Sequence, residues 1–138
     1  QGLTQRNLHG DLRELIARSP ADGGAVTVGP DDTLLTAYNR MRQADVSQLP
    51  VLDGGRLIGL IDESDLLDAV EDSKPDKRFA QSVATAMTAK LDTLQAGDPL
   101  DALLPVFEKD QVAIVLDGRE FVGLITRIDL INYLRRAA

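Results

Sequence analysis

Apolar residues fall into two similar series along the chain. Each series begins with a short apolar run, continues with a stripe at helical spacing, and ends with two apolar runs and a second helical stripe. The first helical stripes are Leu34, Leu35, Tyr38 and Met41 in one series and Leu100, Leu103, Leu104 and Phe107 in the other. Because residues three and four apart share one face of a helix, both stripes predict helices that bury one face.

The two series form an internal repeat. The segment 57–67 recurs as 121–131, an offset of 64 residues, and the segment 51–54 recurs as 115–118 at the same offset. Repetition at a fixed offset indicates one structural unit used twice. Each copy reads as β-α-β-β-α, and a copy of about 50 residues buries too little surface to be stable alone. We therefore expect an α/β fold of two copies that pack together with pseudo-twofold symmetry.

Local signals mark the start of each copy. Short strands are expected at 26–28 and 91–94, where apolar residues end in Gly, Pro or Asp. A helix follows each strand. In the first copy Asp31 or Asp32 is expected to cap it, and in the second copy Asp98 is, because a carboxylate can accept hydrogen bonds from the first helical amides.

The end of each copy is predicted as a hairpin and a helix. The hairpin turns fall at 53–55 and 117–118, where Asp is followed by glycines that tolerate positive φ. The closing helices are expected at 63–71 and 127–136. A glycine lies within the last strand of each copy, at Gly59 and Gly123. A strand glycine commonly marks a close backbone approach or a bulge.

We divide the chain into a linker with a helix at 1–24, a first repeat at 25–72, a linker at 73–81 and a second repeat at 82–138. The N-terminal helix is expected over 8–18, because Leu8, Leu12, Leu15 and Ile16 share one helical face. The linker is polar and is broken by Pro75. A short helix is expected at 82–87, at the start of the second repeat.

Composition narrows the possible functions. The net charge of -7 and an aromatic content of 4% argue against nucleic acid as a partner. The sequence contains no run of eighteen apolar residues, so we expect no membrane span. The chain has no Cys and its one His is His9, so we expect no catalysis and no metal site. A cytoplasmic location is the default, and since the sequence begins with Gln1, we expect a fragment of a longer chain.

The second copy ends its last strand with Gly123-Leu124-Ile125-Thr126-Arg127-Ile128-Asp129, and Gln48-Leu49-Pro50-Val51 precedes the hairpin of the first. A tandem β-α-β-β-α repeat with this Gly-apolar-apolar-Thr-x-x-Asp segment resembles a CBS-domain pair, or Bateman module. The resemblance covers about 25–134 and implies a cleft that holds AMP, ATP or S-adenosylmethionine. It also implies a homodimer, since the helical faces carry more apolar surface than one copy can cover.

The resemblance assigns the ligand site residue by residue. Asp129 would accept the two ribose hydroxyls, and Thr126 would offer its hydroxyl to a phosphate or to the other ribose edge. The remaining residues would line the adenine slot or give polar contacts from the first copy; they are Leu124, Ile128, Val26, Val46 and Gln48, with the backbone of 24–26. The alternative for Asp129 is a helix-start carboxylate favoured by the helix dipole.

A second, weaker site would use Asp65 of the first copy. There Asp62 replaces the hydroxyl residue, and a carboxylate facing a phosphate adds like-charge repulsion. We therefore expect Asp62 to be a capping or solvated acid. Arg127 could reach a phosphate, but a solvent-facing position is favoured. Tyr38 and Phe107 are expected in the core.

The leader and the second copy together look most like the C-terminal regulatory region of bacterial cystathionine β-synthases. This resemblance implies that the module controls its own fused catalytic domain, a pyridoxal-phosphate lyase of cysteine biosynthesis, and needs no cofactor itself. One alternative is a ligand-free dimerisation and assembly module, which the degenerate Asp62 favours. A weaker alternative is a free-standing nucleotide sensor.

Overall fold

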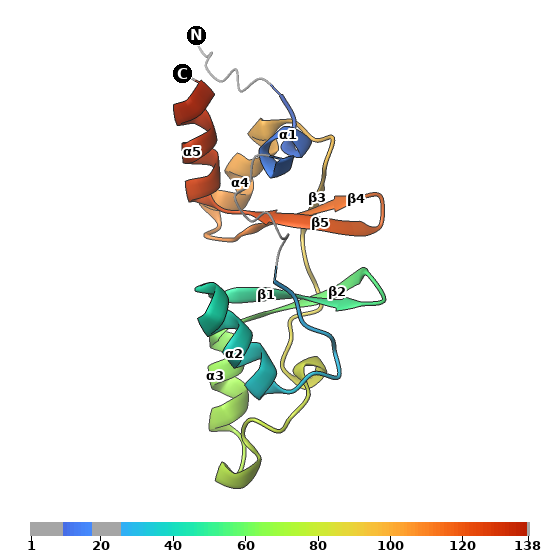
Figure 1. Cartoon of the computed structure of the whole chain (residues 1–138), viewed down its shortest axis with the longest axis vertical. Helices are drawn as coiled ribbons and strands as arrows, with labels where there is room; N and C mark the ends of the chain where they lie inside the picture. The colour runs from blue at the N-terminus through green and yellow to red at the C-terminus, as the bar shows by residue number, and fades with distance from the viewer. Residues whose placement is uncertain (1–9, 18–25, 138) are drawn as a thin grey trace. The chain divides into compact units, whose positions relative to one another are not determined.

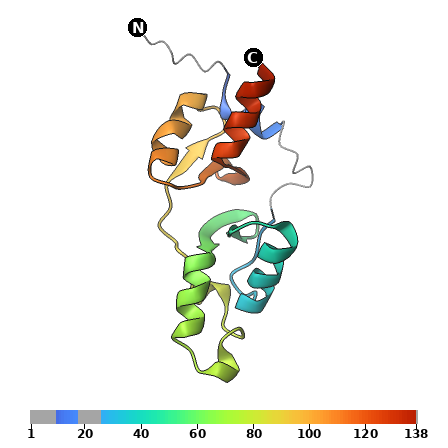
Figure 2. The same cartoon turned by 90° about the vertical axis from the view of Figure 1, so that its left-hand side faces the viewer.

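The structure is a computed structural model that describes residues 10–17 and 26–137. These residues form two compact units, one of 26–91 and one of 10–17 with 92–137 (Figure 1). Each unit is a small sheet with helices packed on one face, as both views show (Figure 2). The predicted α/β fold with two β-α-β-β-α repeats is confirmed.

The 26–91 unit is built on an antiparallel hairpin. Its elements are α2 (Leu34–Ala44), β1 (Gln48–Asp53), β2 (Arg56–Asp62), α3 (Glu63–Glu71) and the 3₁₀ turns η2 (Pro75–Lys77) and η3 (Val83–Thr85). The expected strand at 26–28 is reduced to a single parallel bridge between Val28 and Val51. Helix α3 has the predicted bounds.

The second unit repeats this plan with an added helix. Its elements are α1 (Leu12–Ala17), β3 (Thr93–Gln95), η4 (Leu100–Ala102), α4 (Leu103–Glu108), β4 (Ala113–Asp117), β5 (Glu120–Ile125) and α5 (Arg127–Ala137). Strand β3 pairs in parallel with β4, which pairs antiparallel with β5. The N-terminal helix is confirmed in α1, while Leu8 and Arg18 of the prediction lie outside the described residues.

The two hairpins share their irregularities. Each ladder shifts register at the same repeat position, between Val51 and Leu52 in one and between Val115 and Leu116 in the other. The turn glycines have positive φ values, as predicted, at Gly54, Gly55 and Gly118. A shift shared at an offset of 64 residues indicates that the repeat extends to backbone detail.

The caps predicted for the first helix of each repeat were wrong. Thr33 caps α2, with its hydroxyl accepting from the Thr36 amide at 3.2 Å. Asp32 instead accepts from the amide of Gly29 at 2.7 Å, three residues before it. Asp98 makes the same bond to the Gln95 amide at 2.9 Å, so it closes a turn before η4 rather than capping a helix. Each aspartate lies one residue before the N-cap position of its helix, which is Thr33 for α2 and Pro99 for η4.

The segment before each repeat packs on the other repeat. The amide of Leu12 donates to Asp98 O at 3.0 Å, and the amide of Val83 donates to Asp32 O at 2.8 Å, the matching contact in the 26–91 unit. Leu12 and Val83 are both fully buried. The segments 10–17 and 82–91 therefore play equivalent parts, although only the first extends into an α-helix.

Each unit has its own apolar core. The core of the 26–91 unit contains Val28, Leu34, Ala37, Met41, Leu49, Val51, Ile61, Leu66 and Val83. The other core contains Leu12, Leu15, Ala96, Leu100, Leu103, Phe107, Ala113, Val115, Ile125, Leu130 and Tyr133. The expected core position of Phe107 is confirmed, whereas Tyr38 is half-buried at the edge of its core.

Candidate functional site

The repeated Gly-apolar-apolar-x-x-x-Asp segment runs from a strand into a helix in both units. In each case the first polar residue after a strand lies at the amino end of the closing helix, with β2 leading to α3 and β5 leading to α5. The first amides of a helix have no partner within the helix and need acceptors. This location explains why both segments carry hydroxyl or carboxylate side chains there.

In the second repeat Thr126 and Asp129 bond to each other. Asp129 Oδ2 accepts from the Thr126 amide at 2.9 Å and from the Thr126 hydroxyl at 3.0 Å. The Asp129 amide donates to Thr126 Oγ1 at 3.4 Å, which completes a capping arrangement. The Thr126 hydroxyl was expected to be unengaged. It is instead committed to Asp129, because the helix start brings the two side chains together.

The geometry leaves part of the Asp129 carboxylate available. Both bonds from Thr126 go to Oδ2, and within the described part of the chain no hydrogen bond reaches Oδ1. Asp129 as a whole residue is half-buried. Asp129 therefore does have the alternative role of a helix-start carboxylate, and this role occupies one of its two oxygens.

In the first repeat the corresponding group is a pair of carboxylates. Asp62 caps α3, accepting from the Asp65 amide at 2.8 Å, and Asp65 Oδ2 accepts from the Asp62 amide at 3.1 Å. The predicted capping role of Asp62 is confirmed. The Thr88 hydroxyl also lies 3.4 Å from each oxygen of Asp65. Unlike Asp129, Asp65 thus has bonds at both oxygens.

Burial raises the pKa of the Asp65 carboxyl, and the nearby Asp62 carboxylate adds to the rise. The hydrogen bonds from the Asp62 amide and from Thr88 act in the opposite direction. Repulsion between two carboxylates this close favours protonation of one of them. The first-repeat motif is therefore a poor place for a further negative group.

Arg127 is held inside its own unit. Its guanidinium donates to Phe107 O at the end of α4 and to Asp110 Oδ1 at 2.7 Å. Its side chain is 57% exposed, which agrees with the favoured solvent-facing position. Asp110 has a φ of 58°, so the ion pair ties down a turn that ends α4. The phosphate-reaching role has no support from this arrangement.

The other predicted residues lie in their own units as follows. Leu124 is half-buried in β5 opposite Ile114, and Ile128 is 57% exposed on α5. Val26 and Val46 of the first repeat are 38% and 37% exposed. Gln48 begins β1 opposite Asp62, the first-repeat cap. Of the backbone 24–26, only Val26 is described.

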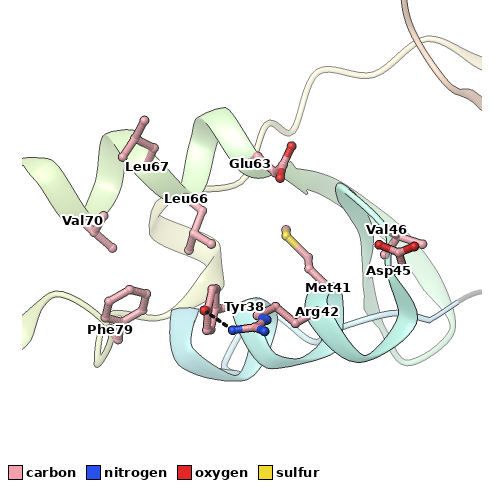
Figure 3. A pocket seen from close by; sticks show the side chains of 10 residues that line it. All are labelled: Tyr38, Met41, Arg42, Asp45, Val46, Glu63, Leu66, Leu67, Val70 and Phe79. Atoms are coloured by element: carbon pink, nitrogen blue, oxygen red, sulfur yellow. Dashed lines mark hydrogen bonds between the residues drawn. The ribbon is translucent and has the colours of Figure 1, made fainter.

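A cavity in the first repeat was not predicted. It has a volume of about 520 Å³ and lies between α2 and α3 (Figure 3). Its lining residues are Tyr38, Met41, Arg42, Asp45, Val46, Glu63, Leu66, Leu67, Val70 and Phe79. Arg42 bridges its edge by donating to the Tyr38 hydroxyl at 3.0 Å. No signal in the sequence indicated this cavity, because the apolar stripe that contains Tyr38 and Met41 predicts a buried helix face.

The fold and the repeated strand-to-helix motif together define a tandem module of two β-α-β-β-α units. The family model described as "CBS domain" matches residues 12–72 and 82–136. The chain belongs to the CBS domain family.

Three relatives illustrate the match. The chain is 29% identical over 108 residues to an inosine-5'-monophosphate dehydrogenase of Methanocaldococcus jannaschii, covering 78% of this chain and 21% of that protein. The chain thus spans about a fifth of that relative. The CBS-domain protein ATU1752 of Agrobacterium tumefaciens is 27% identical, with a TM-score of 0.73, covering 90% of this chain and 98% of that one.

The third relative is known with ligands. The CBS domain pair of protein MJ0100, solved in complex with 5-methylthioadenosine and S-adenosyl-L-methionine, is 19% identical with a TM-score of 0.71. It covers 94% of this chain and 98% of that one.

In the described part of this chain, no helix is long and apolar enough to cross a membrane.

Proposed function

We propose that this CBS-domain pair is a regulatory, non-catalytic module that binds an adenosyl ligand of the AMP, ATP or S-adenosylmethionine class. The MJ0100 module binds two compounds that carry this group, and it shares the fold of this chain. The support from this chain itself is the arrangement of Asp129 at the start of α5. The other residues of the predicted site remain proposals beside it.

The observation that carries the proposal is the half-used Asp129 carboxylate. Thr126 holds Oδ2 from two directions, which fixes the side-chain rotamer, while Oδ1 has no bond among the described residues. A ribose offers adjacent hydroxyl donors, and a carboxylate oxygen is a strong acceptor for them. A fixed carboxylate also loses little conformational entropy when the ligand binds. Ribose capture is the function that suits this geometry best.

The same reasoning makes the second-repeat motif the tighter site. In the first repeat the two oxygens of Asp65 already accept from Asp62 and Thr88, and Asp62 adds a negative charge beside them. A phosphorylated ligand would meet repulsion there unless a cation intervened. We infer that Asp65 serves a weaker site or none.

The regulatory output depends on a partner. A ligand changes a partner's activity only if it binds two arrangements of the module with different affinity. We propose that the partner is a catalytic domain fused to this module, whose activity the bound ligand controls. The finer prediction of a pyridoxal-phosphate cystathionine β-synthase as the parent is not supported by the relatives described above. The match to part of a dehydrogenase supports only the broader proposal that the module belongs to a longer enzyme.

A second candidate function is assembly without ligand. The closing helices leave large apolar side chains exposed, with Leu67 at 58% and Ile131 at 56%. Such residues on matching helices of both repeats favour a homodimer. In this alternative the module joins subunits and its Asp129 carboxylate only caps α5.

A thermal-shift panel separates the two functions. The chain is heated alone and with AMP, ADP, ATP or S-adenosylmethionine, with adenine and ribose 5-phosphate as partial ligands. A ligand at one hundred times its dissociation constant adds about 2.7 kcal/mol to the free energy of unfolding. The sensor function predicts a clear rise in melting temperature with at least one adenosyl compound. No shift with any of them contradicts it and favours assembly.

A further inference from the structure

The segments that precede the two repeats correspond to each other in the structure. A Cβ built at Gly59 would meet the side chain of Met87, and one built at Gly123 would meet the side chain of Ile16. The two glycines hold the same place in the repeated segment, one in β2 and one in β5. Met87 and Ile16 therefore hold equivalent places in the two preceding segments.

The next residue differs in chemistry between the two segments. By this correspondence Thr88 matches Ala17. The same separation along the chain relates Val83 to Leu12, the fully buried residues whose amides make matching contacts. Threonine has a hydroxyl that can donate a hydrogen bond, and alanine has none. A side-chain donor is therefore present in the 26–91 unit and absent at the matching position of the other unit.

The Thr88 hydroxyl lies against the motif carboxylate of the first repeat. Its oxygen is 3.4 Å from each oxygen of Asp65. The backbone of Thr88 is fixed at this place, because its amide donates to Leu60 O at 2.8 Å and its carbonyl accepts from the Leu60 amide at 2.9 Å. The hydroxyl has one proton, and from a position equally far from both carboxylate oxygens it can donate to either of them.

The motif carboxylates of the two repeats are therefore left in different states. Asp65 Oδ2 accepts from the Asp62 amide at 3.1 Å, and the Thr88 hydroxyl is within reach of both oxygens. Among the described residues, Asp129 accepts hydrogen bonds at Oδ2 alone, and both come from Thr126. A ribose hydroxyl that approached Asp65 would compete with a donor already in place. One that approached Asp129 Oδ1 would compete with no hydrogen bond of the described residues.

We propose that Thr88 closes the first-repeat motif to the adenosyl ligand and thereby directs binding to the second repeat. This role of Thr88 rests on the proposed function, in which Asp129 captures a ribose. Repulsion from Asp62 opposes only those ligands that carry a phosphate. A compound without a phosphate, such as 5-methylthioadenosine, does not meet that repulsion, and for it the Thr88 hydroxyl is the barrier that remains. Such a compound therefore separates the effect of Thr88 from the effect of Asp62.

An NMR titration of the Asp65 carboxyl group tests the contact without any ligand. Burial raises the pKa of Asp65, and the hydrogen bond from Thr88 opposes that rise. Thr88→Ala should therefore raise the pKa of Asp65 further, whereas Thr88→Ser, which keeps the hydroxyl, should leave it where it is. An unchanged pKa in Thr88→Ala would show that the hydroxyl does not engage the carboxylate, and it would overturn the proposal.

Calorimetry with 5-methylthioadenosine tests the role in binding, in a chain whose second-repeat motif has been removed. Asp129→Ala should bind the compound weakly. Adding Thr88→Ala should strengthen the binding at least about tenfold, the lower end of the range for a hydrogen bond to a charged group. Adding Thr88→Ser instead is the matched control, and it should bring no gain. A third change, Asp65→Ala, should abolish the gain, because the new binding uses that carboxylate.

Titrations of the wild type and of Thr88→Ala alone separate this role from the proposed function. The wild type should show one binding event for each chain, and Thr88→Ala should keep that event unchanged, which shows that it folds, and add a second. If the wild type binds through Asp129 but Thr88→Ala adds nothing, the role of Thr88 is overturned and the proposed function stands. If neither chain binds any adenosyl compound, both are overturned. An equal gain with Thr88→Ser also overturns the role, since the hydroxyl is then not the cause.

Discussion

The matched glycines of the two last strands should differ sharply in their tolerance of a methyl group. A Cβ at Gly59 would lie 2.6 Å from Met87 Sδ and 3.1 Å from Thr88 O. At Gly123 the nearest atom would be Ile16 Cγ2, at 3.8 Å, which is an ordinary contact. Met87 and Ile16 both come from the segment that precedes a repeat, so the comparison is between equivalent sites.

The cost at Gly59 follows from what can move. The Met87 side chain can change rotamer, but Thr88 O is held by the Leu60 amide at 2.9 Å, and the Thr88 amide donates to Leu60 O at 2.8 Å. Overpacking of this kind costs about 1–3 kcal/mol. Replacing a strand glycine by alanine recovers about 0.5–1 kcal/mol of backbone entropy. The net cost lies between about 0 and 2.5 kcal/mol, and because Thr88 O is held in place we expect Gly59→Ala to destabilise the fold by about 1–2 kcal/mol.

Urea unfolding of both variants measures the difference. Gly123→Ala should match or slightly exceed the wild type, because it gains backbone entropy without a clash. The free energy of unfolding should depend on urea concentration with the same slope in both variants, so that a difference between their midpoints reports a difference in stability alone. A second change, Met87→Ala, should be less costly in the Gly59→Ala background than in the wild type. Equal midpoints for the two glycine variants would refute the close approach at Gly59.

Three further outcomes test local features. Thr33→Ala removes the cap of α2 and should lower the free energy of unfolding by about 1 kcal/mol in a urea titration. Because burial raises the pKa of Asp65 above its ordinary value of 3.8, the folded chain keeps a proton that the unfolded chain has lost, and stability falls as the pH rises through this window. Asp65→Asn should therefore flatten the pH dependence of the urea midpoint above about pH 4, whereas an unchanged profile would contradict the raised pKa. Arg127→Ala should lower the melting temperature, because it frees Phe107 O and Asp110, yet leave adenosyl-ligand affinity unchanged in calorimetry. A loss of affinity would instead support the phosphate-reaching role.

The repeat was visible in the sequence because apolar spacing and turn glycines act locally. The bounds of α3 and the positive φ at Gly54 and Gly118 follow from residues a few positions apart. The caps of the first helix in each repeat were missed because an Asp before a helix can also close the turn that precedes it, as Asp32 does with Gly29. Which of the two bonds forms depends on where the helix begins.

The candidate site was less predictable than the fold. The motif identified Asp129, but its bond to the Thr126 hydroxyl depends on both rotamers. The contact of Thr88 with Asp65 joins residues 23 apart, through a segment expected only to begin the second repeat. The cavity beside α3 is lined by Leu67, which is exposed, and by Val70, which packs at the edge of the core, and helical spacing alone does not distinguish these two positions.

The most direct test of the central claim is isothermal calorimetry with the best ligand of the adenosyl panel on wild type, Asp129→Ala and Asp65→Ala. Hydrogen bonds to charged groups are worth about 1.5–3 kcal/mol, so loss of the Asp129 carboxylate should weaken the tighter binding event at least about tenfold. Asp65→Ala should leave that event nearly unchanged, and it serves as the matched control because it also removes a capping carboxylate. Equal losses in the two variants, or a loss only with Asp65→Ala, would contradict the account.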